Sequence, residues 1–237
     1  MTIDQGIAID SPSADDSGVP AYLRDIYTWA YLTPLAVAIF DHQPIVSMIL
    51  WGNFHRLLRG VLAEVPQGGS ALQLASVYGP FSLRLLEALG PRGSLDVVDV
   101  APVQVERCRA LLGGYSNCRV LSGDAADPPG NASYDVVISF FLLHEVPEDY
   151  KERIVMAALA RVRPGGRAVF VDYHEPVRWH PLRPIMTKVF DWLEPYAKGL
   201  WSREVADYAG QRAEEFSWRK VTCFGGLYQQ VVAERRV

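Results

Sequence analysis

Short apolar runs alternate with stretches of helical spacing through the middle of the chain. Apolar runs bounded by turn residues predict strands within 70–81, 93–100, 119–125, 134–139 and 168–175. Between these runs, apolar residues recur at the spacing of amphipathic helices, and Pro164-Gly165-Gly166 predicts a turn before the last run. Strands and helices that alternate in this way predict an α/β fold with a parallel sheet and helices on both faces.

The regions outside this alternation carry other patterns. Residues 20–64 predict a helical lid, and residues 176–217 predict a loop and helices inserted near the active site. Residues 218–223 and 227–234 predict two closing strands that form an antiparallel edge. The apolar face expected in the insertion consists of Ile185, Met186, Val189, Phe190, Leu193 and Tyr196.

Composition narrows the class of protein. The chain has 237 residues, 49% of them hydrophobic, which is enough for a single large domain over residues 20–237. A net charge of −4 gives no indication of a nucleic-acid partner. The three scattered cysteines have no metal-site spacing and indicate a reducing compartment. Residues 1–19 are rich in Asp, Ser, Gly and Pro and are predicted to be disordered.

No segment is predicted to span a membrane. The most apolar region, residues 32–51, is interrupted at 41–44, and neither half reaches the ~20 residues that a bilayer requires. The N-terminus lacks a basic region followed by an apolar stretch, so no signal peptide is predicted. Attachment to the surface of a membrane stays open as an alternative.

The turn after the first predicted strand is the most informative segment. In nucleotide-binding βαβ units this turn is glycine-rich, because only glycine lets the backbone approach a ligand closely. This chain keeps Gly79 but carries Ala75, Val77 and Tyr78 at the other sensitive positions. The strand, turn and helix of this unit therefore predict a nucleotide site, but its loop differs from the usual glycine-rich one.

Acidic residues end the next two predicted strands. Asp99 lies about 20 residues beyond the opening turn, where an acid can hydrogen-bond ribose hydroxyls. Asp124, followed by Ala125, ends the strand after it. Both carboxylates are expected at the carboxyl edge of the sheet, where open α/β sheets bind their ligands.

The order of these features resembles that of class I S-adenosylmethionine (SAM) methyltransferases, over about residues 68–175 and the closing strands. The resemblance implies a Rossmann-like, mostly parallel seven-stranded sheet with a helical N-terminal lid. In that family the second strand ends in a ribose-binding acid and the third in an adenine-contacting Asp. The resemblance implies SAM contacts at Gln73, Ala75, Tyr78, Gly79, Asp99, Val100, Asp124, Ala125 and Phe140.

The loop departs from the general family pattern. Gln73 stands where the family has an acid, and Ala75 and Val77 replace glycines. Together with residues 22–32 and 49–53, this looks like the RquA family of rhodoquinone-biosynthesis proteins. That resemblance implies conversion of ubiquinone to rhodoquinone, in which an amino group from SAM replaces a ring methoxy group with help from Mn(II). Two alternatives stay open: a conventional SAM-dependent O- or C-methyltransferase acting on a quinone or aromatic compound, and a degenerate SAM-binding scaffold.

Gln73 offers a hypothesis for changed chemistry. An acid beside the ammonium group of SAM favours the protonated amine, which has no lone pair and cannot attack a quinone. Neutral Gln73 withdraws that bias, so the methionyl arm is expected to present its nitrogen rather than the sulfonium methyl. The residues expected to handle protons are Tyr78, His144 and His174.

Oxygen and imidazole groups suited to Mn(II) follow the fourth and fifth predicted strands. The candidate ligands are His144, Glu145, Asp172 and His174, whereas His180 is interpreted as structural. In metal-dependent quinone O-methyltransferases a Glu-His pair lies near this point. Here the order is reversed, and Phe141 replaces the preceding Glu.

Aromatic residues at helical spacing are the candidates for a quinone pocket. These are Tyr27, Trp29, Tyr31 and Trp51. A lipid quinone as substrate implies peripheral attachment to the cytoplasmic face of the inner membrane. The lid and the helices between Trp179 and Trp201 are the segments expected to make that contact.

Overall fold

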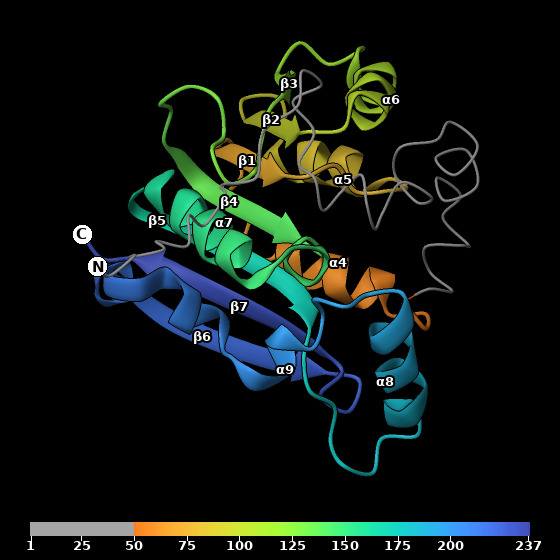
Figure 1. Cartoon of the computed structure of the whole chain (residues 1–237). Coiled ribbons are helices and arrows are strands. Elements are labelled where there is room, and N and C mark those ends of the chain that lie inside the picture. Colours follow the sequence, from red (N-terminus) through yellow and green to blue (C-terminus); the bar gives the residue numbers. More distant parts are fainter. Residues whose placement is uncertain (1–49) are drawn as a thin grey trace, which may run out of the picture.

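A mixed seven-stranded sheet forms the centre of the computed structural model, which describes residues 50–237 (Figure 1). The strand order is β3-β2-β1-β4-β5-β7-β6. The first five strands pair in parallel, and β7 is inserted antiparallel between β5 and β6. The strands are β1 (Ser70–Leu74), β2 (Ser94–Asp99), β3 (Cys118–Ser122), β4 (Tyr134–Phe140), β5 (Val162–Tyr173), β6 (Phe216–Cys223) and β7 (Tyr228–Arg235). The predicted mostly parallel sheet and its antiparallel edge are confirmed.

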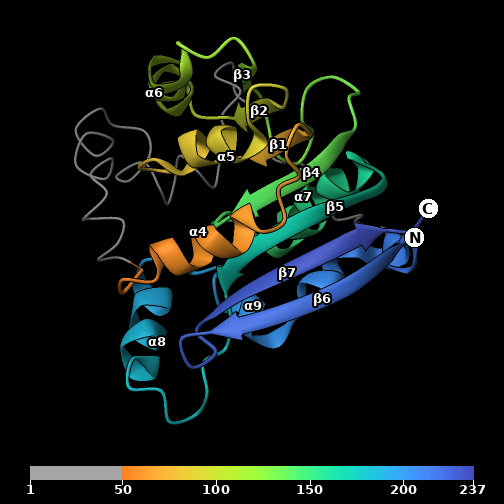
Figure 2. The same cartoon turned by 180° about the vertical axis from the view of Figure 1, so that it is seen from behind.

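Helices cover both faces of the sheet. On one face lie α4 (Phe54–Leu62), α5 (Phe81–Leu89) and α6 (Pro102–Leu112) (Figure 2). On the other lie α7 (Glu148–Ala160) and the 3-10 segment η2 (Val205–Glu215) (Figure 1). Short connecting elements complete the chain: η1 (Leu143–Glu145), α8 (Arg183–Trp192) and α9 (Gly199–Ser202).

The central strands are apolar on both sides because both faces of the sheet are covered. Every residue of β4 is buried, and β2 is buried from Leu95 to Asp99. A strand covered on both faces carries a continuous apolar run rather than alternating apolar and polar residues. This is why short apolar runs were a sufficient signal for strands of the parallel part.

The predicted lid of residues 20–64 lies mostly outside the described residues. Its described helix, α4, buries Phe54, Leu57 and Val61 and contacts α5, β5 and β7, so it is a layer of the core. The predicted disorder of 1–19 also lies outside the described residues. The same holds for three predicted quinone contacts, Tyr27, Trp29 and Tyr31.

The fifth strand begins earlier than predicted. The segment Pro164-Gly165-Gly166, predicted as a turn, lies inside β5, whose pairing with β4 shifts register between Tyr134 and Val136. Gly165 has a φ of 73°, and a Cβ on Gly166 would come within 2.9 Å of the Asp135 carbonyl oxygen. The two glycines therefore form a bulge rather than ending the strand.

The predicted apolar face of the insertion is buried only in part. Met186 and Phe190 of α8 are buried, but Ile185 is 46% exposed and Leu193, just beyond the helix, is 50% exposed. Of the residues on α8, Met186 and Phe190 are buried and Val189 packs against the core from a partly buried position, because the helix lies at the edge of the sheet rather than across a face (Figure 1). None of the helices within residues 50–237 is long and apolar enough to cross a bilayer.

Candidate active site

The strand order reverses direction between β1 and β4. A crevice forms at the carboxyl ends of the strands at such a reversal, and open α/β sheets bind ligands there. The segments that follow β1, β2 and β4 reach this edge of the sheet (Figure 1). The candidate site is therefore built from loops that a buried sheet holds in place.

Asp99 fixes the loop after β1 to the end of β2. Its Oδ2 accepts a hydrogen bond from the Ser76 backbone N–H at 2.7 Å, and its Oδ1 accepts one from Ala101 at 2.9 Å. Burial raises the pKa of Asp99 to about 6, although these backbone bonds and the charge of Arg107 act in the opposite direction. A buried carboxylate at this edge is the group that the sequence predicted for the ribose hydroxyls.

Gln73 is directed into the protein rather than toward the crevice. It is fully buried at the end of β1. Its Nε2 donates to the Ala75 carbonyl at 2.9 Å, and its Oε1 accepts a hydrogen bond from the Ser82 hydroxyl at 2.8 Å. Ala75 adopts a φ of 65°, in the left-handed region that favours glycine. The Gln73 amide thus connects the loop to the start of α5. It also holds Ala75 in a backbone conformation that is usual for glycine.

Helix α6 holds the rest of the altered loop. The Tyr78 hydroxyl accepts a hydrogen bond from Gln104 Nε2 at 2.7 Å, and the Arg107 guanidinium lies 5.0 Å from the centre of the Tyr78 ring. Arg107 also donates to the Ser76 hydroxyl and to the Val77 carbonyl. Gly79 completes the turn with a φ of 75°. Side chains from α6 therefore support a loop that is poor in glycine.

Asp124 lies beyond β3, in a turn rather than at the strand end. Its Oδ1 accepts a hydrogen bond from the Ala126 backbone N–H at 2.8 Å, and its Oδ2 accepts one from the Tyr150 hydroxyl. The neighbouring Ala125 and, after β2, Val100 are half-buried. Tyr150, from α7, was not predicted and orients the carboxylate that the resemblance assigns to adenine.

Phe140 belongs to the core. It is 3% exposed, its ring centre lies 4.4 Å from that of Phe81, and its ring meets Phe54 edge-on. The residue is predicted to contact SAM, and its ring packs against Phe54 of α4 and Phe81 of α5, which leaves the backbone at the end of β4 for such a contact. A hydrophobic residue at the end of a strand covered on both faces faces the core as readily as the crevice.

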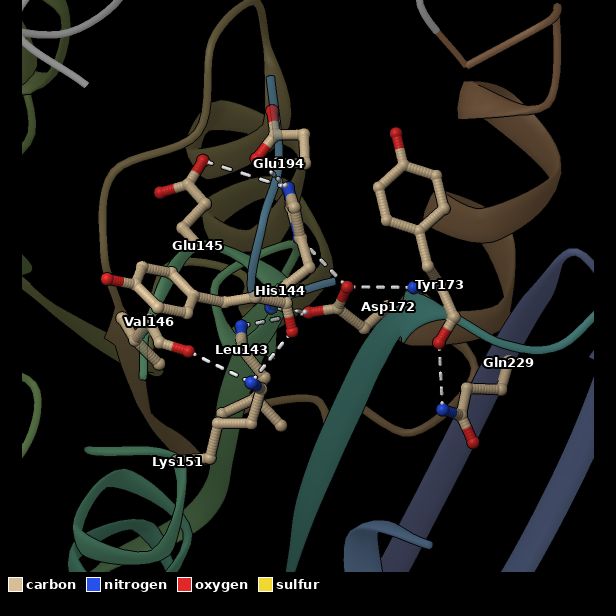
Figure 3. A network of polar contacts seen from close by, with 10 residues as sticks. Leu143, His144, Glu145, Val146, Lys151, Asp172, Tyr173, Glu194 and Gln229 are labelled. Carbon is tan, nitrogen blue, oxygen red and sulfur yellow. Dashed lines mark hydrogen bonds and ion pairs between the residues drawn. The ribbon is translucent and has the colours of Figure 1, made fainter. Parts of the chain in front are cut away.

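His144 and Asp172 form a buried pair between η1 and the end of β5 (Figure 3). Their Nδ1 and Oδ1 atoms are 2.9 Å apart. The second carboxylate oxygen of Asp172 accepts hydrogen bonds from the backbone N–H groups of Leu143 and His144, and Oδ1 also accepts one from Tyr173. One carboxylate thus fixes the fold of η1 and the orientation of the imidazole.

The other ring nitrogen of His144 faces two more carboxylates. Nε2 lies 3.9 Å from Glu145 Oε1 and 4.0 Å from Glu194 Oε2 (Figure 3). Desolvation lowers the pKa of His144, but Asp172, Glu194 and Glu145 together outweigh it and raise the pKa to about 9. The imidazole is therefore held as a cation at neutral pH. Sequence reasoning missed Glu194, because it follows α8, 50 positions from His144 and without a local motif.

The four predicted metal ligands do not form one group. Among residues 50–237, no three His, Cys, Asp or Glu side chains are arranged to hold a metal ion. Asp172 already accepts hydrogen bonds on both oxygens, and His174 Nδ1 lies 2.9 Å from the Gly226 carbonyl. His174 lines a separate open cavity of about 1110 Å³, together with Arg56 and Phe224. The donor set predicted for Mn(II) therefore does not fit this arrangement.

Lys151 is a buried cation that the sequence analysis did not identify. Its ammonium donates to the Val146 carbonyl at 2.9 Å, the Tyr196 carbonyl at 2.9 Å and Glu148 Oε1 at 2.5 Å. These bonds tie the segment after η1 to the segment that precedes α9. Lys151 therefore fixes the backbone on both sides of the His144 site.

Aromatic rings form a wall beside His144. The ring centres of Phe141 and Tyr173 lie 5.3 Å apart, and each of the two rings meets His144 edge-on. A wall of this kind suits a flat, apolar ring. Trp51, the only described member of the predicted quinone pocket, is 43% exposed near the start of α4. Among the described residues, the rings that meet the imidazole are those of Phe141 and Tyr173, which the sequence analysis did not single out for this pocket.

Comparisons with known proteins agree with this geometry. Residues 71–166 match the family described as "Methyltransferase domain". The chain is 27% identical over 154 residues to a ubiquinone/menaquinone biosynthesis C-methyltransferase, UbiE, of Ectopseudomonas mendocina, covering 62% of this chain and 57% of that protein. It is 26% identical over 163 residues to a demethylmenaquinone methyltransferase of Bacillus licheniformis, covering 67% of this chain and 68% of that protein.

Solved structures share the fold at low sequence identity. An O-methyltransferase family protein from Burkholderia thailandensis superimposes with a TM-score of 0.66 at 15% identity, covering 85% of this chain and 60% of that one. The N-methyltransferase NodS of Bradyrhizobium japonicum, in complex with S-adenosylhomocysteine, gives a TM-score of 0.57 at 16% identity, covering 94% and 93%. The described part of the chain therefore has the class I methyltransferase fold, and residues 71–166 match a methyltransferase domain.

Proposed function

We propose that this protein is a SAM-dependent enzyme of quinone biosynthesis that modifies the ring of a quinone or its hydroquinone. Methyl transfer is the reaction that the comparisons support best, since the methyltransferase family matches residues 71–166 and relatives named as quinone methyltransferases match 62% to 67% of the chain. The observation that carries the proposal is the buried, ion-paired His144 beside an aromatic wall at the same edge of the sheet as Asp99.

In this proposal Asp99 binds the ribose hydroxyls of SAM and Asp124 contacts its adenine. The substrate of methyl transfer is the hydroquinone, and its ring stacks near Phe141 and Tyr173. The cationic His144 donates a hydrogen bond from Nε2 to a ring oxygen and stabilises the negative charge of a phenolate. The electron-rich ring attacks the methyl group, the methyl–sulfur bond breaks, and S-adenosylhomocysteine leaves. For attack by a ring carbon, the displaced proton passes to water.

A second candidate is amino transfer from SAM, and Gln73 is the observation that favours it. Gln73, at the position of the usual acid, is neutral and fully buried. Its amide donates a hydrogen bond to the Ala75 carbonyl and accepts one from the Ser82 hydroxyl. It therefore supplies no carboxylate that would keep the SAM amine protonated. An unprotonated amine can add to the methoxy-bearing carbon of ubiquinone and expel methoxide. The bond between that nitrogen and the α-carbon of SAM must then break to leave an amino group on the ring. A requirement for Mn(II) in this reaction is left to measurement, because the four residues predicted to bind the metal do not form one group.

One labelling experiment separates the two candidates. The purified protein is incubated with ubiquinone or a demethylated precursor and with SAM that carries ¹³C in its methyl group and ¹⁵N in its amino group, with and without Mn(II). Mass spectrometry of the quinone gives ¹³C for methyl transfer and ¹⁵N for amino transfer. Incorporation of neither label by a protein that binds SAM would contradict both candidates and leave the scaffold alternative.

The Gln73→Asp variant tests the argument from the loop. If the neutral amide permits amino transfer, the variant loses ¹⁵N incorporation while SAM binding persists. The matched control is Gln104→Glu, which places a new carboxylate on the other side of the loop, beside Tyr78 and Arg107. Equal effects of the two variants would show that added negative charge near the loop, rather than a carboxylate at the end of β1, is responsible.

A further inference from the structure

The loop after β5 and helix α8 present an apolar surface to solvent. Trp179 and Trp192 are each 85% exposed, which is unusual for the largest apolar side chain. We call this the tryptophan surface, and it consists of Val177, Trp179, Ile185, Trp192 and Leu193, with exposures of 46% to 85%. An exposed apolar cluster of this kind marks a site of interaction with a protein or a membrane.

Helix α8 is apolar on two sides. Met186 and Phe190, four residues apart, fill the core, and Phe190 packs edge-on against Tyr173 and Trp201. Ile185 and Trp192 are seven residues apart, which places them together on another side of the helix. The core face accounts for the fold of α8, so the outer apolar side chains require a separate explanation.

The charge around these side chains is positive although the whole chain has a net charge of −4. Arg183 is paired with Glu175 and Asp191 with Lys198, so Arg178 and Lys188 are the cations that supply positive charge beside the tryptophans. Arg178 and Lys188 are exposed, and the guanidinium of Arg178 lies 5.5 Å from the centre of the Trp179 ring. Tryptophan beside arginine or lysine suits the boundary between lipid headgroups and acyl chains, where the ring is partly buried and the cation meets a phosphate.

The tryptophan surface adjoins the open cavity beside β5. Val177 and Arg178 line that cavity, and Arg56 lines it from α4. The loop and α8 project beyond the carboxyl end of β5, the end at which His144 and Asp172 lie (Figures 1 and 2). A flat bilayer bound to the tryptophan surface would therefore lie next to the carboxyl edge of the sheet, where the candidate site lies.

We propose that the tryptophan surface docks this protein on a bilayer that contains anionic lipids. The two tryptophans enter the interface, and Arg178 and Lys188 contact phosphate groups. A second copy of the chain fits less well, since a twofold contact through this surface would bring the same cations face to face. This inference does not depend on the reaction at the site.

Vesicle sedimentation with the full-length protein tests the docking directly. We expect binding to vesicles of phosphatidylcholine with phosphatidylglycerol, weaker binding to phosphatidylcholine alone, and release by high salt. The double variant Trp179→Ser/Trp192→Ser is expected to lower partitioning at least about tenfold, and Arg178→Glu/Lys188→Glu to abolish the preference for anionic lipid. Neither SAM nor quinone is present, so the result stands apart from the proposed reaction.

The matched control places serines at exposed apolar positions elsewhere. Tyr115→Ser/Val221→Ser changes side chains that are 44% and 57% exposed, and partitioning is expected to stay unchanged. Circular dichroism and SAM titration confirm that each variant is folded. Absence of vesicle binding, or an equal loss in the control, would overturn the proposal. So would a dimer in sedimentation velocity that the tryptophan variant dissociates while vesicle binding is unaffected.

Discussion

One carboxylate organises the loop after β1, and another organises the His144 site. Asp99 connects the altered loop to β2, and Asp172 connects η1 to β5. Each accepts hydrogen bonds on both oxygens, so each organises a backbone segment while remaining able to influence a ligand or a ring nitrogen. The loss of one charge at either position is therefore expected to have specific effects.

The Asp99→Asn variant is expected to bind SAM roughly 10- to 100-fold more weakly, since a hydrogen bond to a charged group contributes about 1.5–3 kcal/mol. The new amide group also faces a backbone N–H that needs an acceptor. Titration calorimetry with SAM measures the effect. The control is Asp96→Asn on the same strand, where the carboxylate binds Arg119 and Tyr134. That variant should lose stability but not SAM affinity, and equal loss of affinity in both would contradict the role of Asp99.

His144 makes the stability of the protein depend on pH in a defined window. Its pKa is raised from 6.5 to about 9 in the folded state, so its stabilising effect is complete below pH 6.5 and is lost as pH rises through 9. The free energy of unfolding is expected to fall by up to about 3 kcal/mol over this window. Urea unfolding of the wild type and of His144→Gln between pH 6 and 9.5 measures it. The difference between the two stability curves should shrink with rising pH, and a constant difference would rule out the cationic imidazole.

At the scale of elements, the unusual feature is how the loop after β1 meets helix α6. Glycine-rich loops approach a ligand through bare backbone, whereas this loop carries Val77 and Tyr78 and rests on Gln104 and Arg107. Helix α6 thus has a second role beyond covering β2 and β3. The loop conformation is expected to depend on that helix.

The Arg107→Met variant is expected to loosen the loop and weaken SAM binding about tenfold, because the hydrogen bonds to Ser76 and Val77 disappear. Amide hydrogen exchange of residues 75–79 should accelerate while exchange in the sheet is unchanged. Arg109→Met is the control on the same helix, where an exposed guanidinium binds the Val120 carbonyl. Unaltered exchange in the loop of the Arg107 variant would show that α6 does not hold it.

The prediction of elements from the sequence was accurate where both faces of a strand are buried. The ends of β2 and β4 agree with the prediction within one residue, because their apolar runs stop where burial stops. The Pro164-Gly165-Gly166 segment was assigned to a turn, because glycine and proline signal a turn and a bulge alike. The apolar face predicted for α8 left its burial undecided, because apolar spacing does not distinguish a buried side of a helix from an exposed one.

At the scale of the whole molecule, the C-terminal hairpin completes the sheet. Strand β7 pairs with β5 over seven positions, from Arg167–Glu234 to Tyr173–Tyr228, and separates it from β6. Without the hairpin, β5 would present an unpaired apolar edge that carries Asp172 at its end. The last 20 or so residues therefore support the edge of the sheet that carries the candidate site, although they are distant from it in sequence.

A chain truncated after Glu215 is expected to be insoluble or to melt without cooperativity, because it exposes the edge of β5. Solubility and thermal denaturation measure this outcome. A chain truncated after Arg235 keeps the whole hairpin and serves as the control, with a melting temperature close to that of the full chain. Cooperative melting of the shorter chain would mean that β1 to β5 fold without the hairpin.

The sequence by itself determined the alternating order of strands and helices, the altered loop, and the acids that follow β2 and β3. These features are local, because a residue's place in an apolar period or a turn depends on its neighbours in the chain. Only the tertiary structure brought Glu194 and Asp172 to His144, turned Gln73 inward, and separated His174 from His144. Those relations join segments far apart in sequence, and the packing of the sheet and its helices decides which side chains meet.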